Sequence, residues 1–132
     1  YDEIVIKAKG ISNLLVTGEL SNIEVQNLIS QSDVVILTSS FEGLPMIILE
    51  AMSLGKPVVS TDVGAISEII DNNIDGYLCS LDSIQETMPE LIEMAYSNRD
   101  RLENIVKDKI QSKYNEDRMQ NNYIKLFNEI IS

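Results

Sequence analysis

Two short apolar runs and one apolar helix follow each other between residues 33 and 64. Residues 34–37 are four consecutive aliphatic side chains, mostly β-branched, and this pattern predicts a strand that is buried on both faces. Pro45 then stands at the first position of a predicted helix, which is apolar nearly all round and ends at Gly55. Residues 57–60 predict the next buried strand. The three elements together have the size of one right-handed parallel crossover unit.

Further strands are predicted on both sides of this unit. Residues 14–17 form an earlier apolar run, and residues 77–79 form a last, short one. A short helix is predicted over residues 66–70, between the third strand and the fourth. About four strands separated by helices define an α/β domain with a mostly parallel, Rossmann-like sheet over residues 1–80.

Two helices are predicted before the central unit. Residues 1–9 read as the end of a helix that closes at Gly10. Ser21 and Glu24 have the spacing of a capping box, which predicts that a helix begins at residue 22 and continues to residue 32. We expect its inward face to consist of Ile23, Leu28 and Ile29, with Val25 at the margin.

Residues 83–132 show helical spacing and no strand pattern. Ser83 and Glu86 predict a second capping box, at the start of a helix. The expected core-facing stripe of this helix is Met88, Leu91, Ile92, Ala95 and Tyr96. Residues 99–113 alternate charges around apolar positions, as a solvated amphipathic helix does. Residues 116–131 carry another apolar stripe, which we interpret as core or, alternatively, as a surface that docks another domain: Met119, Tyr123, Leu126, Phe127, Ile130 and Ile131.

Charge and composition limit the possible partners. The chain has 132 residues and a formal net charge of -11, which argues against nucleic-acid binding because that requires clustered Lys and Arg. It contains no histidine, so histidine-based nucleophile activation and histidine metal sites are excluded. The single cysteine, Cys79, cannot form an internal disulfide, which favours burial and a reducing, cytoplasmic compartment.

The length and the start of the chain suggest one domain of a longer protein. No apolar run approaches the length that a membrane span needs. The sequence opens with Tyr1 rather than Met and shows no signal peptide, so we expect a piece of a longer protein.

Candidate chemistry lies in the loops that follow the two central strands. In a parallel sheet, ligands bind outside the carboxyl ends of the strands, so the loop with Glu42 and the loop with Gly64 are expected on the same rim. Glu50 is the only charge on the apolar helix. It either marks the solvated strip of that helix or binds a ligand, because ionised carboxylates are rarely buried without a partner.

The two glutamates lie within motifs that carry a family resemblance. These motifs are SSFEGLP at residues 39–45, LEAMSLGKPVV at residues 49–59, VGAISEII at residues 63–70 and DGYL at residues 75–78. In this order and spacing the chain resembles the group 1 (family 4) retaining glycosyltransferases. LVTG at residues 15–18 and KYN at residues 113–115 also fit the family's pattern, so the resemblance covers most of the chain.

The resemblance implies a fold and an activity. Residues 1–132 would be part of the nucleotide-sugar-binding, carboxyl-terminal domain of a GT-B fold. The enzyme would transfer a sugar with retention, without a cofactor or required metal, in polysaccharide, glycolipid or capsule biosynthesis. The donor would be a nucleotide sugar, in particular a UDP-sugar, and the acceptor a saccharide or lipid bound by an N-terminal domain. The full-length enzyme could be peripheral to the cytoplasmic face of a membrane.

The resemblance also assigns residue roles. Glu42 lies beside the donor sugar and is the catalytic candidate, and Glu50 binds the ribose. The base would rest against the turn at residues 18–21, which makes Leu20 a binding candidate. The family's basic pair for the phosphates lies upstream of this sequence, so the chain alone is expected to be inactive.

The chemistry of these residues suits the assigned roles. A carboxylate accepts hydrogen bonds only, so Glu50 can take both hydroxyls of a ribose diol. The diphosphate can meet the helix N-terminus, where the N–H groups of Gly43, Leu44 and Met46 are available. Gly64 is either a turn glycine or a donor contact. Ser39 and Ser40 could cap loop backbone groups, and two sets of carboxylates look solvated: Asp62 with Glu19, and Asp82 with Glu86, Glu90 and Glu93.

Two other functions remain as alternatives. A receiver-like regulatory module has a similar size, but it needs a paired acidic cluster after the first strand and a lysine after the last. Here those strands are followed by Thr17-Gly18-Glu19 and by Ser80-Leu81. A sugar-nucleotide epimerase of the same overall fold is the second alternative, which the absence of histidine disfavours.

Overall fold

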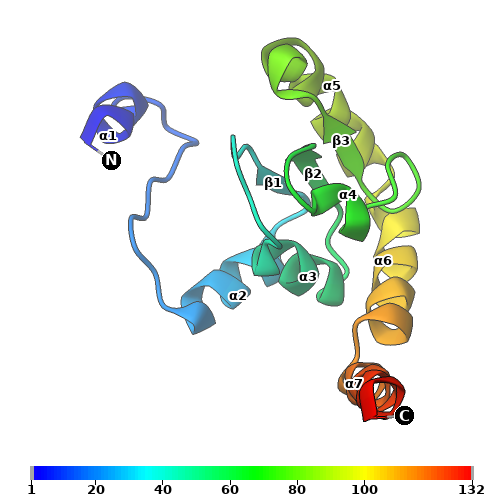
Figure 1. Cartoon of the computed structure of the whole chain (residues 1–132). Helices are drawn as coiled ribbons and strands as arrows, with labels where there is room; N and C mark the ends of the chain where they lie inside the picture. The colour runs from blue at the N-terminus through cyan, green and yellow to red at the C-terminus, as the bar shows by residue number, and fades with distance from the viewer. Residues whose placement is uncertain (1, 132) are drawn as a thin grey trace.

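The computed structural model describes the backbone of residues 2–131 and the side chains of residues 5–131. Figure 1 shows a small sheet with helices on both sides and a helical carboxyl-terminal part. In chain order the elements are α1 (Asp2–Ala8), α2 (Asn22–Gln31), β1 (Val35–Leu37), α3 (Met46–Ser53), β2 (Val58–Thr61), α4 (Ile66–Ile69), β3 (Tyr77–Cys79), the 3-10 helix η1 (Leu81–Ser83), α5 (Ile84–Ser97), α6 (Arg99–Lys113) and α7 (Glu116–Ile131).

Within residues 2–131 the sheet has three parallel strands, in the order β1-β2-β3. Val35 pairs with Val58 across the first pair of strands, and Val59 pairs with Tyr77 across the second. Strands β1 and β2 form at the two apolar runs that predicted them. The strand–helix–strand unit around α3 is therefore confirmed. The parallel α/β class predicted from the sequence is therefore confirmed.

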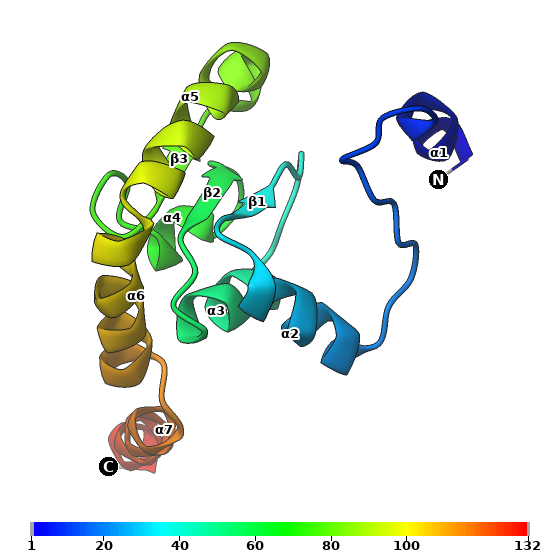
Figure 2. The ribbon, with the colours of Figure 1, turned by 180° about the vertical axis from the view of Figure 1, so that it is seen from behind.

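The fourth strand expected at residues 14–17 is absent from the described chain. This segment is not a strand, and the side chain of Leu15 is 76% exposed. Figures 1 and 2 show it running apart from the sheet, between α1 and α2. The prediction was wrong because an apolar run becomes a buried strand only where neighbouring elements cover both of its faces.

The core is divided between the two faces of β2. Successive side chains of a strand point to opposite faces, and Val58 and Val59 accordingly belong to different clusters. Val58 packs with Ile48 and Met52 of α3, the buried side of α4 and Val106 of α6. Val59 packs with Tyr77 and with the buried side of α5. Figure 2 shows α5 on the opposite side of the sheet from α3.

Helix α2 begins at the predicted capping box but faces the core differently than expected. The Ser21 side chain and the Glu24 side chain each bond the other's backbone N–H, as predicted. Ile29 is buried and Val25 packs against the core, whereas Ile23 is 73% exposed and Leu28 is exposed. The i and i+4 positions define the single strip that meets the core, so assigning Ile23 and Leu28 to the inward face was wrong.

The second predicted capping box, at α5, does not form. The Ser83 hydroxyl lies 3.0 Å from the Ser80 hydroxyl and 3.3 Å from that of Thr87, and it caps no backbone N–H of the helix. The 3-10 helix η1 runs directly into α5, so the chain enters the helix already coiled. Met88 and Ala95 are buried as expected, whereas Tyr96 is exposed and its ring stacks under the guanidinium of Arg99.

Helices α6 and α7 have the predicted bounds, and they differ in burial. Leu102 and Val106 of α6 are fully buried. Every described side chain of α7 is exposed, including the apolar stripe that begins at Met119. Interpreting this stripe as core was therefore wrong for this chain, because α7 extends away from the sheet beyond α6 (Figure 1). The alternative, a docking surface, stays a hypothesis.

Candidate functional site

The loop after β1 is fixed at Ser39. The Thr61 hydroxyl, at the end of β2, donates to the Ser39 carbonyl at 2.7 Å. The Ser39 hydroxyl donates to the Glu42 carboxylate at 2.6 Å. We expected this hydroxyl to satisfy loop backbone groups, and that expectation was wrong, because it bonds the side chain of the catalytic candidate. The bond holds the Glu42 carboxylate in one orientation at the end of the strand.

The loop after β2 lies against the loop that carries Glu42. Gly64 has a φ of +59°, and a Cβ built on it would stand 1.9 Å from the Glu42 carbonyl oxygen. The Ala65 N–H donates to the Gly43 carbonyl at 3.2 Å. The two loops therefore share one rim, as the sequence predicted. The absence of a side chain at Gly64 is required by this contact and by the positive φ; a contact of Gly64 with the donor stays a prediction.

The remaining candidates lie just before helix α3, at its start and in its middle. Pro45 is its N-cap rather than its first residue, and Met46 begins the helix. Leu44 and Met46 are exposed, with Gly43 before them, so the N–H groups expected to meet a diphosphate lie at an accessible helix end. Glu50 is one helical turn beyond Met46 and is partly buried. This partial burial is compatible with both predictions for Glu50, a side chain on the solvated strip of the helix and a group that binds a ligand.

The other sequence candidates lie outside this rim. Leu20 is partly buried and directly precedes the N-cap residue of α2, so the structure does not place it in either loop. Asp62 and Glu19 are exposed, as expected of loop charges. The acidic side chains at positions 82, 86, 90 and 93 are exposed as well. In the described residues, no group of three or more Cys, Asp or Glu side chains could hold a metal ion.

Sequence reasoning missed an ion cluster beneath α4. Lys109 of α6 donates to Asp71 at 2.9 Å and forms a second, short ion pair with Asp75. The side chain of Lys109 is 8% exposed and that of Asp75 is 3% exposed. The sequence indicated no role for either aspartate. The signal that could have revealed the cluster is the position of Lys109, three residues after Val106 and seven after Leu102, on the buried stripe of α6.

The cluster shifts the titration of two of its members. A hydrogen bond from Lys109 and the charge of its ammonium hold the pKa of Asp71 below its ordinary value. Burial by itself would lower the pKa of Lys109, but hydrogen bonds to Asp75 and Asp71 outweigh it and raise the pKa above its ordinary value. Both shifts favour the charged form of the side chain, the carboxylate of Asp71 and the ammonium of Lys109.

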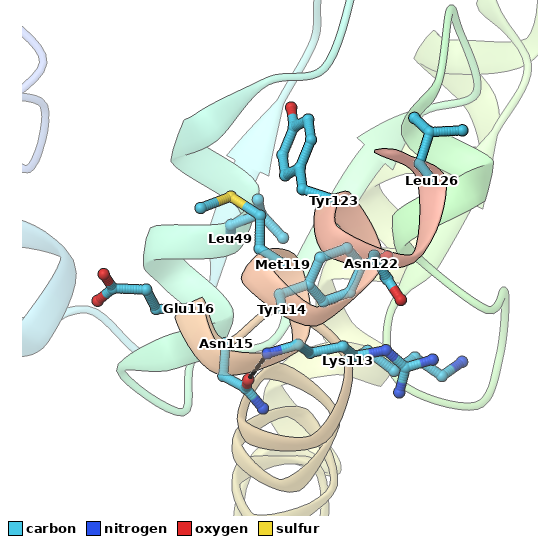
Figure 3. Close-up of a pocket in the computed structure, with 10 residues that line it drawn as sticks. Leu49, Lys113, Tyr114, Asn115, Glu116, Met119, Asn122, Tyr123 and Leu126 are labelled. Carbon is cyan, nitrogen blue, oxygen red and sulfur yellow. Dashed lines mark hydrogen bonds between the residues drawn. The ribbon is translucent and has the colours of Figure 1, made fainter. Parts of the chain in front are cut away.

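A groove of about 490 Å³ lies between α3 and α7. Figure 3 shows Leu49 of α3 beside Met119 of α7, and Tyr114 and Tyr123 also line the groove. Nothing in the sequence indicated this groove, because its walls come from helices more than 60 residues apart. None of the helices in the described part of the chain has the length and apolarity to cross a bilayer.

Comparison with known proteins identifies the family to which this chain belongs. The family model described as glycosyl transferases group 1 matches residues 3–112. UDP-Gal:alpha-D-GlcNAc-diphosphoundecaprenol alpha-1,3-galactosyltransferase of Escherichia coli is 32% identical over 71 residues, which are 54% of this chain and 18% of that protein. N-acetyl-alpha-D-glucosaminyl L-malate synthase of Bacillus anthracis is 33% identical over 81 residues, 61% of this chain and 21% of that protein.

The fold has a solved counterpart. The crystal structure of TarM superposes with a TM-score of 0.79 at 23% identity, covering 96% of this chain and 26% of that one. The chain belongs to the group 1 glycosyltransferase family, and its α/β fold matches part of this GT-B-type structure. The chain spans about a fifth of the length of these two curated relatives.

Proposed function

We propose that this chain is the donor-binding part of a retaining glycosyltransferase that transfers a sugar from a nucleotide sugar, in particular a UDP-sugar, to a saccharide or lipid-linked acceptor. The setting is polysaccharide or glycolipid biosynthesis. The chain acts within a longer protein, whose N-terminal domain binds the acceptor, and it is inactive alone. Family membership supports this proposal, and the Escherichia coli relative is named for UDP-Gal and a diphosphoundecaprenol-linked GlcNAc.

The observation that carries the proposal is the fixed position of Glu42. Its carboxylate accepts a hydrogen bond from Ser39, and its backbone lies against Gly64 of the neighbouring loop. A carboxylate held in this way can orient the hydroxyls of a sugar without reorganisation during the reaction. Because Glu42 and Glu50 would repel a diphosphate, they face hydroxyls, and the phosphates meet the N–H groups at the start of α3.

Each glutamate has a separate role in this proposal. Glu50 accepts hydrogen bonds from the ribose diol, and Glu42 orients the transferred sugar at the reacting end. The leaving diphosphate is stabilised by the helix N-terminus together with basic residues outside this sequence. No metal or cofactor takes part. No observation on the described residues favours the alternative function, a sugar-nucleotide epimerase.

Titration of the full-length enzyme with uridine diphosphate tests the proposal. We expect Glu50→Ala to weaken binding by about 1 to 3 kcal/mol, because the ribose hydroxyls lose their acceptor. Glu90→Ala, which removes an exposed carboxylate from α5, is the matched control and should bind like wild type. Equal affinities for Glu50→Ala and wild type would reduce Glu50 to a surface residue. A parallel titration with guanosine diphosphate tests the choice of base.

Turnover of several donors by Glu42→Gln tests the second role. We expect kcat to fall by at least about tenfold, with an unchanged unfolding temperature, and the loss to differ among donors that differ in the sugar. Wild-type turnover in this variant would remove Glu42 from the reacting end.

A further inference from the structure

Helix α4 connects the candidate site to the ion cluster. It is a single turn, Ile66–Ile69, and its N-terminal flank consists of Gly64 and Ala65. These two residues make the contacts with the backbone of Glu42 and Gly43. A helix of one turn is not stable by its own hydrogen bonds, so its position depends on what holds it from outside.

Helix α6 and Tyr114, the residue that follows it, form hydrogen bonds with α4 and with the turn after α4. The Tyr114 hydroxyl donates to the Glu68 carbonyl at 3.1 Å. Just beyond the end of α4, Lys109 bonds the carboxylates of Asp71 and Asp75. Asp75 in turn accepts the Asp71 N–H at 2.8 Å, so the turn after α4 is closed around the buried ammonium.

The contacts that α4 makes toward α6 differ in kind from the contact that Gly64 makes toward the candidate site. On the side of α6, directional hydrogen bonds reach the Glu68 carbonyl of α4 and the two aspartates just beyond its end. On the side of the candidate site Gly64 leaves no free space, because any Cβ would overlap the Glu42 carbonyl. The buried side chains of Ile66 and Ile69 in α4 fill the space between these two sets of contacts. A displacement on one side is therefore transmitted to the other, because protein interiors are close-packed.

We propose that Lys109 and Tyr114 are positioning residues for Glu42, acting through α4 and the loop at Gly64. The inference rests on the proposed function, because it assumes that Glu42 orients the sugar. Glu50 is outside the hydrogen bonds that link Lys109 and Tyr114 to α4 and the turn after it. It lies on α3, whose buried residues Ile48, Ala51 and Met52 pack in the same core cluster as α4.

The test compares two quantities in the same variants: kcat, which depends on Glu42, and affinity for uridine diphosphate, which depends on Glu50. In the full-length enzyme we expect Lys109→Met to lower kcat about tenfold and Tyr114→Phe about threefold, because small displacements of a positioned group are costly. The dissociation constant for uridine diphosphate, which reports on the Glu50 side, should stay within about twofold of wild type in both variants. Lys109→Arg, which keeps the charge, should recover part of the lost turnover.

Lys107→Met is the matched control, on the same helix. Lys107 pairs with Glu103 at the surface, and neither residue contacts α4 through a hydrogen bond or ion pair. We expect it to leave kcat unchanged. If Lys109→Met does not fold, Tyr114→Phe decides the test, since it removes only one exposed hydroxyl.

Two results would overturn the inference. One is wild-type kcat in Tyr114→Phe and in folded Lys109→Met. The other is a joint loss of kcat and uridine diphosphate affinity that follows the fall in unfolding temperature, which is what a merely structural role produces. Failure of the proposed function looks different, because Glu42→Gln itself would then keep wild-type turnover.

Discussion

Gly64 and Glu42 are in backbone contact, although 22 positions separate them in the sequence. A Cβ on Gly64 would lie 1.9 Å from the Glu42 carbonyl oxygen and 2.8 Å from its carbonyl carbon. Both atoms belong to the backbone, so no side-chain rotation can relieve the overlap. The contact fixes the distance between the loops that follow β1 and β2.

Gly64→Ala is therefore expected to destabilise the chain and to displace Glu42. The positive φ alone costs about 1–3 kcal/mol for a residue with a side chain, and the overlap adds to this. Thermal unfolding measures the effect. Gly43→Ala is the stability control, because a Cβ there meets nothing within 4 Å. If both variants unfold at the same temperature, the loops do not meet as described.

Ser39→Ala is expected to lower both the turnover and the stability of the full-length enzyme. The hydroxyl of Ser39 donates to the Glu42 carboxylate, and hydrogen bonds to charged groups contribute about 1.5–3 kcal/mol. If that energy orients Glu42 in the reaction, kcat falls by about tenfold or more. Ser40→Ala, at an exposed neighbouring position, should have no effect. Equal activity of Ser39→Ala and wild type would show that the bond does not orient a reacting group.

The ion cluster predicts a difference in acid stability between wild type and Asp71→Asn. The pKa of Asp71 is lower in the folded chain than its ordinary value of 3.8, because Lys109 donates to it. The unfolded state then binds more protons in acid, so the stability from this group is present above pH 3.8 and is lost as the pH falls through the folded pKa.

Asp71→Asn lacks this proton uptake. Urea unfolding at about pH 6 and at about pH 3 should therefore show that wild type loses more stability on acidification than the variant. The Asp71 side chain is half exposed, so the difference is reduced by solvent. If the two proteins lose stability in parallel, Asp71 is not paired in solution.

Two methionines distinguish the core from the exposed stripe of α7. Met52 is 0% exposed, and Met119 is 54% exposed. We expect Met52→Ala to lower the free energy of unfolding by about 2–5 kcal/mol, and Met119→Ala to change it by less than about 0.5 kcal/mol. Urea unfolding of the chain measures both. A large effect of Met119→Ala would mean that α7 packs against the domain in solution.

The sequence predicted elements whose signals are local. The apolar runs became β1, β2 and β3, the capping box at Ser21 begins α2, and α6 and α7 have the predicted bounds. The glutamate motifs predicted the family, and the family is confirmed. These signals could be read because a strand, a cap or a helix is specified by residues within a few positions of each other.

The sequence could not predict which element, if any, packs against the apolar side of each helix or strand. The run at residues 14–17 and the stripe of α7 are apolar, yet both are exposed, whereas Lys109 is charged and buried. Hydrophobic pattern fixes which side of an element prefers contact, but burial requires another element on that side, and only the tertiary structure supplies it. For the same reason the meeting of Gly64 with Glu42, and of Lys109 with two aspartates 34 and 38 positions away, was decided by the packing of α4 between its neighbours.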